Sequence, residues 1–178
     1  MNIQEAEVIK IEKVGIGTRI CIDVVDNLDP LEGALVGNTG HGYLMVLSEN
    51  RSTKTYPARP FRINCGALHQ YIYLGEEQTI YLSEMKPGMR LPIVNKGQAR
   101  MVAVGRVKAE KRELIRVVCK IADKEISATL QASDSVHVLS NKLAQSVETL
   151  ELGDKILCLP DEPGRHLGKK IEEEIWEI

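Results

Sequence analysis

The sequence has no long apolar run and never approaches the roughly 18 apolar residues that a membrane-spanning helix needs. Its opening stretch, MNIQEAEVIKIEKV, places charge every few positions and lacks the apolar core of a secretory signal. An excess of positive charge is also missing: 23 Lys and Arg against 25 Asp and Glu give a net charge of −2, which argues against a protein that mainly coats nucleic acid. Local basic patches remain open. We therefore expect a cytoplasmic protein that acts on neither membranes nor nucleic acids.

Paired cysteines and nucleotide-binding loops are absent as well. The wide spacing of the cysteines, with no C-x-x-C pair, predicts free thiols in a reducing compartment. They are Cys21, Cys65, Cys119 and Cys158. There is no G-x-G-x-x-G, Walker loop, G-x-S-x-G or H-E-x-x-H motif, and Gly15 and Gly17 form only an isolated G-x-G. No self-contained nucleotide site is visible.

What is present is the pattern of an all-β protein with little helix. Short Val- and Ile-rich stretches are broken about every eight to twelve residues by Gly, Pro, Asn or Asp, which predicts barrel-like or sandwich units. The terminal segment KIEEEIWEI has helical spacing of its isoleucines, but its context favours an edge strand. The other predicted strands are Glu7–Val14, Arg19–Val25, Gly42–Leu47, Ala67–Leu74, Thr79–Leu82, Arg90–Val94, Met101–Ala109, Leu114–Ile121, Glu125–Leu130, Ser135–Leu139 and Lys155–Leu159.

One internal similarity bears on the domain organisation. EMKPGMRLPIV (Glu84–Val94) resembles TLELGDKILCL (Thr149–Leu159), and both read as a turn followed by a strand. A duplicated unit would give two related small barrels or one pseudo-symmetric barrel, whereas a shared turn preference would give the same similarity by chance. We predict an N-terminal β unit over residues 1–78 and a C-terminal β unit over residues 79–178.

The stretch RPFRINCGALHQY (Arg59–Tyr71) concentrates the polar chemistry. In an extended chain Arg62 and Asn64 project from one face, and guanidinium groups match carboxylate or phosphate oxygens. Arg59 precedes this pair, and His69 could rejoin the site after Gly66. The motif predicts a site for a small, oxygen-rich anion. The alternative is that the arginines form structural ion pairs and His69 is a hydrogen-bonded core residue.

A second basic group alternates along GRVKAEKR. Arg106, Lys108, Glu110 and Arg112 would share one face of a strand, either to hold an anion or as a solvated surface. Arg165 and His166 lie between glycines in GRHLG. This segment either places a cation in a cleft or is simply a turn. His137 alternates with valines and reads as structural, and His41 in a glycine-rich loop is undecided. Glu32, in the LEGALVG turn, and Glu49 could bind a divalent metal with His69 or His166.

Several of these segments resemble the archaeal-type 3-dehydroquinate synthases (dehydroquinate synthase II), a family that also includes the aminohydroxybenzoate synthases. Arg59–Tyr71 resembles the family signature R-P-F-R-V-N-A-G-x-V-H-x-Y. Further matching segments follow in the family's order along nearly the whole chain. They are EAEV, VGIGTRICIDVVD, EGALVG, LSE, YLSEMKPG, VGRVKAEKR, LQ and GRHLG.

The resemblance implies an NAD-dependent enzyme of the shikimate pathway that oxidatively deaminates and cyclises an amino-dideoxy-heptulosonate to 3-dehydroquinate. The sibling group implies a divalent metal. The resemblance reaches only the C-terminal half of the family's usual chain. We therefore expect one of two partners: a separate chain that supplies the missing N-terminal half, or a second copy of this chain. This sequence departs from the family pattern at Leu47, Cys65, Gln70 and Met89, and the Leu47 change removes a histidine.

The residue patterns and the resemblance together assign roles. Substrate binding would fall to basic and amide side chains, proton transfer to histidines, and metal binding to Glu32 and Glu49. The substrate-binding set is Arg59, Arg62, Asn64, Arg106, Lys108, Arg112 and Arg165, and the catalytic pair is His69 and His166. Two alternatives stay open: a non-catalytic domain that binds a small anionic metabolite, and a structural module that assembles with itself or another protein.

Overall fold

The computed structural model describes residues 1–166, 169–170 and 176–178 and confirms an all-β fold. Its helical elements are two 3-10 turns, η1 (Leu82–Glu84) and η2 (Val147–Thr149). Most of the predicted terminal strand lies outside the described residues; within it, Lys170 belongs to a short strand and residues 176–178 to none. The strands are β1 (Gln4–Val24), β2 (Gly33–Gly37), β3 (Gly42–Glu49), β4 (Arg59–Ala67), β5 (Tyr71–Gly75), β6 (Gln78–Tyr81), β7 (Arg90–Asn95), β8 (Gln98–Ile121), β9 (Lys124–Gln131), β10 (His137–Ser140), β11 (Leu143–Ser146), β12 (Lys155–Pro160), β13 (Arg165–His166) and β14 (Lys169–Lys170).

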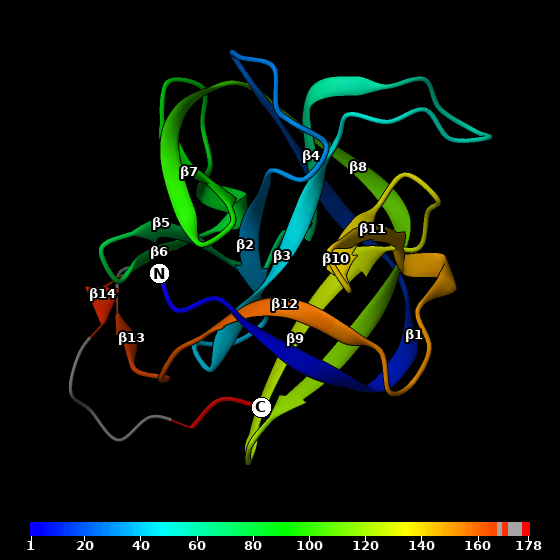
Figure 1. Cartoon of the computed structure of the whole chain (residues 1–178). Helices are drawn as coiled ribbons and strands as arrows, with labels where there is room; N and C mark the ends of the chain where they lie inside the picture. Colours follow the sequence, from blue (N-terminus) through cyan, green and yellow to red (C-terminus); the bar gives the residue numbers. More distant parts are fainter. Residues whose placement is uncertain (167–168, 171–175) are drawn as a thin grey trace.

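Two long antiparallel strands, β1 and β8, run through the whole molecule (Figure 1). The sequence pattern predicts each of them as two shorter strands, and that prediction is wrong. In β1 the expected break falls at Gly15, which has a φ of +91°. The chain does not reverse there; instead the pairing with β8 shifts register between Lys13 and Gly15. Pairing continues on both sides of the irregularity, from Glu7–Lys120 to Val24–Val104.

Six strands close into a ring. β1 pairs with β4, β4 with β3, β3 with β2, β2 with β7, β7 with β8, and β8 returns to β1. Closing a sheet in this way leaves no free edge within the ring. The other half of the molecule is built from the opposite ends of β1 and β8, together with β3, β9, β10, β11 and β12.

The two halves repeat one local structure. β6, η1 and β7 recur 65 residues later as β11, η2 and β12. In the first copy Gly88 N donates to Val104 O of β8 at 2.8 Å, and in the second Gly153 N donates to Val8 O of β1 at 2.8 Å. β1 and β8 therefore occupy equivalent places in the two halves. The division into units at residue 78 stays a prediction.

Strand β2 and the start of β5 differ from the sequence-based expectations. The LEGALVG segment, predicted as a turn, contributes β2. Its Gly33 and Gly37 allow β2 to lie close against β3, because a Cβ at either position would be 2.2 Å from a carbonyl oxygen of β3. Ala67 ends β4 instead of starting the next strand, since the chain turns at residues 68–70 before β5. The sequence pattern does not predict β11.

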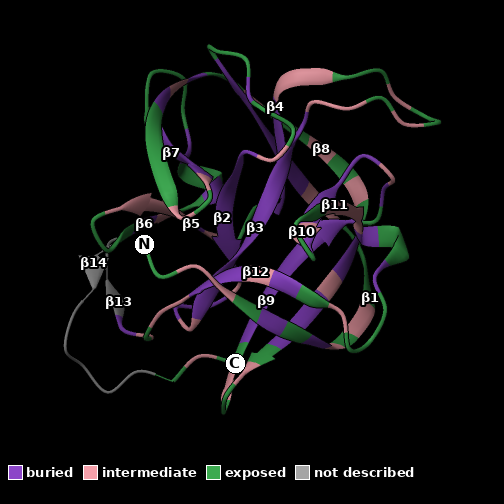
Figure 2. Cartoon of the chain, viewed as in Figure 1, coloured by how far each residue is buried: buried purple, intermediate pink, exposed green. Residues whose placement is uncertain are grey.

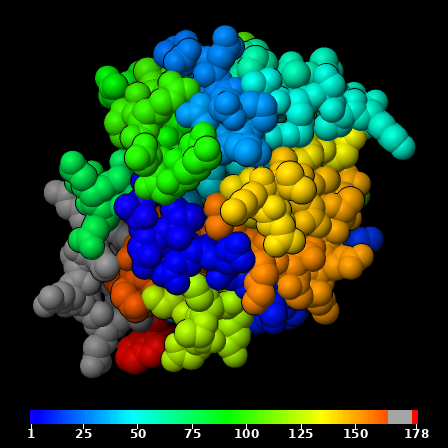
Figure 3. Space-filling model, in the orientation of Figure 1, coloured from blue at the N-terminus to red at the C-terminus, as the bar shows by residue number. Residues whose placement is uncertain are grey.

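The core follows from the strand alternation. Ile20, Ile22 and Val24 of β1 join Ile115, Val117 and Cys119 of β8 in one buried cluster that spans both halves. β2 and β3 are buried along their whole length (Figure 2). In Figure 3 the N-terminal residues lie at the surface beside β12. No helix among the described residues is long and apolar enough to cross a membrane.

Candidate functional site

The two predicted basic strand faces lie on either side of β1. Asp23 of β1 pairs in register with Arg62 of β4 and with Arg106 of β8. Because side chains two residues apart share a face, one surface carries the polar side chains of all three strands. We call this set the polar face; it consists of Arg19, Cys21, Asp23, Arg62, Asn64, Arg106, Lys108, Glu110 and Arg112.

Asp23 holds one end of the polar face together. Arg62 donates through Nε to Oδ1 at 2.8 Å and through Nη2 to Oδ2 at 3.1 Å, and Arg106 Nε donates to Oδ2 at 2.7 Å. Burial opposes ionisation of Asp23, but these hydrogen bonds outweigh it and lower its pKa. Next to it, burial raises the pKa of the Cys21 thiol to about 11, so this thiol is not a nucleophile at neutral pH.

Gln131 of β9 organises the other end. Its Oε1 accepts from Arg19 Nη1 at 2.9 Å and from Asn64 Nδ2 at 2.8 Å. Arg19 also donates to Glu110 at 3.0 Å, and Glu110 in turn pairs with Lys108 and Arg112. Arg19, Asn64 and Gln131 are all buried, so the network fixes their side chains away from solvent.

A third group of charges adjoins the polar face at the start of β4. Arg59 Nη2 lies 2.7 Å from Glu49 Oε1, and the Arg59 guanidinium stacks 4.5 Å from the ring centroid of Tyr56. Burial raises the pKa of Glu49 even though Arg59 and Arg62 oppose the shift. The predicted metal ligand Glu49 is therefore committed to an arginine.

Three buried polar atoms in this region make no hydrogen bond within the described structure. They are Arg19 Nε, Asn64 Oδ1 and Arg59 Nε. Each unmade hydrogen bond costs about 1–3 kcal/mol. The polar face and the Glu49–Arg59 pair also hold six cationic side chains against three acidic ones, which leaves a surplus of three positive charges. Such an arrangement is poor for stability and suited to attracting an anion.

The repeated architecture provides an internal comparison. In the second half β8 pairs with β9 as β1 pairs with β4 in the first: Val118 faces Ser127 where Asp23 faces Arg62. Arg116 pairs with Glu12 at 2.8 Å, so the described residues of the second half form no buried charge cluster on this face. The same strand arrangement therefore forms without a buried aspartate and arginine, and the polar face is not a requirement of the fold.

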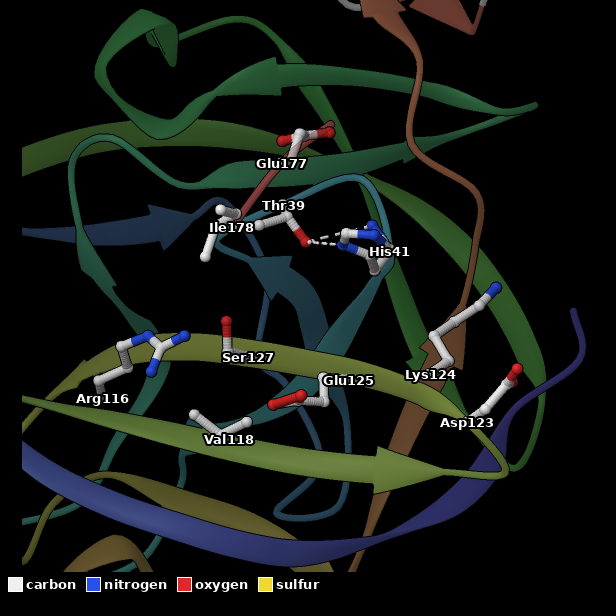
Figure 4. A pocket seen from close by; sticks show the side chains of 10 residues that line it. All are labelled: Thr39, His41, Arg116, Val118, Asp123, Lys124, Glu125, Ser127, Glu177 and Ile178. Carbon is white, nitrogen blue, oxygen red and sulfur yellow. Dashed lines mark hydrogen bonds between the residues drawn. The ribbon is translucent and has the colours of Figure 1, made fainter. Parts of the chain in front are cut away.

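Figure 4 shows the cavity of the second half, 280 Å³ in volume. His41 lies on the loop between β2 and β3, where its Nδ1 is 2.8 Å from Thr39 Oγ1. Ser127 comes from β9 and Arg116 from β8. Lys124, at the cavity edge, pairs with Glu162 at 2.7 Å. The cations that line this cavity with His41 already have acidic partners: Arg116 pairs with Glu12 and Lys124 with Glu162.

His69 lies beside the Arg19 end of the polar face, since Ala67 is the register partner of Arg19. It lines a 400 Å³ groove together with residues that include Gly15 and Gly17. His69 Nε2 is 2.8 Å from Asn38 Oδ1, and the Asn38 amide nitrogen donates to Ser127. Because Oδ1 only accepts, Nε2 carries the proton and Nδ1 is the basic atom of the neutral ring. Burial lowers the pKa of His69, which favours that neutral form.

The remaining predicted residues are elsewhere. Glu32 accepts hydrogen bonds from Arg100 at 2.8 and 3.0 Å, and those bonds lower its pKa. Across residues 1–166 and the other described positions, no group of three or more His, Cys, Asp or Glu side chains is arranged to hold a metal. Arg165 and His166 lie on β13, and their side chains are outside the described part of the structure.

Sequence reasoning missed three members of the site: Arg19, Asp23 and Gln131. The alternation of Arg19, Cys21 and Asp23 on a predicted strand is a usable signal, because it places two charges on the face opposite Ile20 and Ile22. Gln131 has no such signal, since its role depends on how β9 lies against β4.

Comparison with known proteins finds relatives over nearly the whole chain. Residues 5–178 match the family model described as the 3-dehydroquinate synthase II C-terminal domain. Relatives named 3-dehydroquinate synthase come from Methanosphaera stadtmanae (38% identical), Methanosarcina acetivorans (40%) and Haloquadratum walsbyi (35%); each match covers 99% of this chain and 50%, 47% and 45% of the relative, respectively. No solved structure matches. The chain spans about half the length of these relatives, and it belongs to the 3-dehydroquinate synthase II family, matching its C-terminal domain.

Proposed function

We propose that this chain provides the anion-binding part of a 3-dehydroquinate synthase of the second type. The relatives' name supplies the reaction, and the observation that carries the assignment is the surplus of positive charge on a face that the fold does not require. In this proposal the carboxylate of an amino-dideoxy-heptulosonate, or of the 3-dehydroquinate formed from it, lies over β1. Arg106, Lys108 and Arg112 are the exposed cations that contact it.

The buried members of the site act by positioning. Asp23 fixes the Arg62 guanidinium through two hydrogen bonds, and Gln131 fixes Arg19 and Asn64. Preorganised charges of this kind contribute to catalysis because they need not rearrange as the reaction proceeds. His69 is the proposed proton acceptor, through Nδ1, when the ligand extends from the polar face into the adjoining groove.

NAD fits the proposed reaction as hydride acceptor, but the described residues offer it no recognisable cradle. Their helices are two three-residue 3-10 turns, so they contain no α-helix N-terminus for a pyrophosphate. We therefore derive no step through NAD from this chain and assign its binding to the part of the enzyme that corresponds to the other half of the relatives. The divalent metal has no three-ligand group among the described residues either, and no step is routed through it.

Binding of 3-dehydroquinate to the chain, measured by isothermal titration calorimetry, tests the proposal. We expect the double variant Lys108→Ala/Arg112→Ala to weaken binding by about tenfold to a hundredfold, because each charge-assisted contact contributes about 1.5–3 kcal/mol before solvent screening. Lys142→Ala, at an exposed lysine on the β10–β11 turn, is the matched control and should bind like the parent. Equal affinity in all three proteins, or no affinity in the parent, would reject the site.

A further inference from the structure

Strand β8 has an unpaired edge in its middle. One of its edges pairs with β1 along most of its length. On the opposite edge, β7 and the turn before it reach only as far as Val104, and the pairing with β9 and Ala132 begins only at Glu113. Among the described residues, no strand pairs with residues 105–112 on that side. Unpaired backbone groups of this kind are a template for another strand.

The free edge of β8 is regular and accessible. Glu113 O accepts a backbone hydrogen bond on this side, so residues at two-residue intervals before it also point their N–H and C=O groups outward. These outward residues are Lys111, Ala109 and Val107. Pairing with β1 on the other edge continues without a register shift from Arg106 to Glu113, which keeps the three in phase. Ala109 and Lys111 are exposed, and Val107 is half-buried.

The equivalent edge of β1 is irregular. Among the described residues it too lacks a strand partner between Val8, which bonds to the turn before β12, and Thr18, which bonds to Leu68. In this stretch its pairing with β8 shifts register at two points, and Gly15 has a φ of +91°. Bulges of this kind turn an edge away from other strands. Of these two free edges, that of β8 is the one suited to continue a sheet.

The sequence of the β8 edge is complementary to itself. If a second copy pairs antiparallel about a two-fold axis at Ala109, all three outward residues are used: Ala109 lies opposite Ala109, and Val107 opposite Lys111 of the second copy. Any other two-fold register places one of the three against a residue outside this set. The alternate side chains belong to the polar face, and there Lys108 lies opposite Glu110 of the second copy, twice. Opposite charges in such cross-strand pairs stabilise a sheet.

The same register brings two arginines together where the copies meet. Arg106 would lie opposite Arg112 of the second copy, with Cβ atoms about 5 Å apart. Within one chain these two residues are about 20 Å apart along the strand. Directly opposite like charges destabilise a sheet, and an anion between them removes the repulsion. Both guanidinium groups are partly exposed, at 63% and 41%, so each ligand position would be bordered by cations of both copies.

We propose that this edge of β8 joins two copies of the chain in one continuous antiparallel sheet, and that an anionic ligand binds between Arg106 of one copy and Arg112 of the other. The pairing follows from the free edge and its sequence. The shared ligand position rests on the proposed function, because its ligand is the small carboxylate assigned there. Three outward residues from each copy make a small contact, so the dimer is weak without ligand and tightens when an anion is bound.

Cysteine cross-linking tests the pairing. Ala109→Cys should give a disulfide-linked dimer on mild oxidation, because hydrogen-bonded antiparallel partners have Cα atoms about 5.5 Å apart, within the range of about 4.4–6.8 Å for disulfides. Lys111→Cys is the matched control on the same exposed edge, since its two copies would be about 14 Å apart and could not be bridged. The four native cysteines are buried. We expect about tenfold more linked dimer from Ala109→Cys than from Lys111→Cys on non-reducing gels.

Sedimentation velocity over a range of chain concentrations gives the second test. Ala109→Pro removes the central outward N–H and leaves the hydrogen bonds to β1 in place, so it should weaken the dimer by about tenfold or more. Ala109→Ser keeps that N–H and should associate like the parent. Inorganic phosphate, used as the anionic probe, should tighten the parent dimer and have no such effect on Arg112→Ala.

The outcomes separate the two parts of the proposal. Equal cross-linking of Ala109→Cys and Lys111→Cys would overturn the pairing, and so would a parent chain that stays monomeric up to its solubility limit. A dimer that phosphate does not affect would overturn the shared ligand position. Cross-linking is measured without ligand, so its result is independent of the 3-dehydroquinate binding that decides the proposed function.

Discussion

Replacing Asp23 with asparagine should destabilise the chain strongly, because one carboxylate neutralises two arginines. It accepts three hydrogen bonds, and its side chain is 5% exposed against 10% for Arg62 and 63% for Arg106. The asparagine amide would place donors against donors and leave Arg62 as a buried charge without a counterion. Removing one partner of a buried pair costs about 3–5 kcal/mol, while the exposed Arg106 pair adds less than about 1 kcal/mol. We therefore expect a loss of about 3 kcal/mol.

Urea unfolding followed by circular dichroism measures this loss, with Asp26→Asn as control, since that carboxylate is 58% exposed and pairs only at the surface with Arg100. The pH dependence gives a second readout. Because the folded-state pKa of Asp23 is lowered, its contribution is complete above the unfolded-state pKa and disappears as the pH falls through the folded-state pKa. Asp23→Asn should reduce the fall in the free energy of unfolding at low pH. A loss below about 1 kcal/mol, or the same fall at low pH in parent and variant, would refute the account of Asp23 as the electrostatic centre of the polar face.

Glu49 should behave in the opposite way, because burial raises its pKa in the folded state. The free energy of unfolding should therefore decline as the pH rises from the unfolded-state pKa through the folded-state pKa. Glu49→Gln should remove that decline in urea melts recorded over a series of pH values. If parent and variant decline alike, Glu49 is not the group responsible. Gly33→Ala should cost more than about 2 kcal/mol, because a Cβ there would lie 2.2 Å from Val46 O; Gly105→Ala, whose nearest contact is a side chain at 3.2 Å, is the milder control in the same thermal melts. The thiols of Cys21, Cys65, Cys119 and Cys158 should resist Ellman's reagent at pH 8 in the native chain and react in urea, since each is buried with a raised pKa. Rapid labelling of the native chain would contradict their burial.

Local periodicity explains how much of the site could be predicted from sequence. Arg62 and Asn64, and separately Arg106 and Lys108, were placed on shared faces by the two-residue repeat of a strand. That β1 lies between them follows from pairing between residues more than 80 positions apart, such as Asp23 with Arg106, which no local pattern encodes. Arg19 and Asp23 were therefore missed although their own alternation is visible.

Glycine explains the main error in the fold. The sequence pattern predicts chain breaks at Gly15 and at the glycines of LEGALVG, because glycine most often marks turns. In the structure Gly15 accommodates a bulge within β1, and Gly33 and Gly37 allow β2 to approach β3 closely. Both uses are defined by a neighbouring strand, so they become readable only once the partner strand is known.

The length of β1 has a consequence for the order in which the protein can fold. Its register partners are β4, β8 and β12, and the last of these begins at Lys155. A ribosome delivers β1 well before β12, so Gln4, Glu5 and Ala6 stay without their β12 partners until about 150 further residues have been added. Contacts of such separation slow folding. We expect the pairing of β1 with β12 to be among the last native contacts to form.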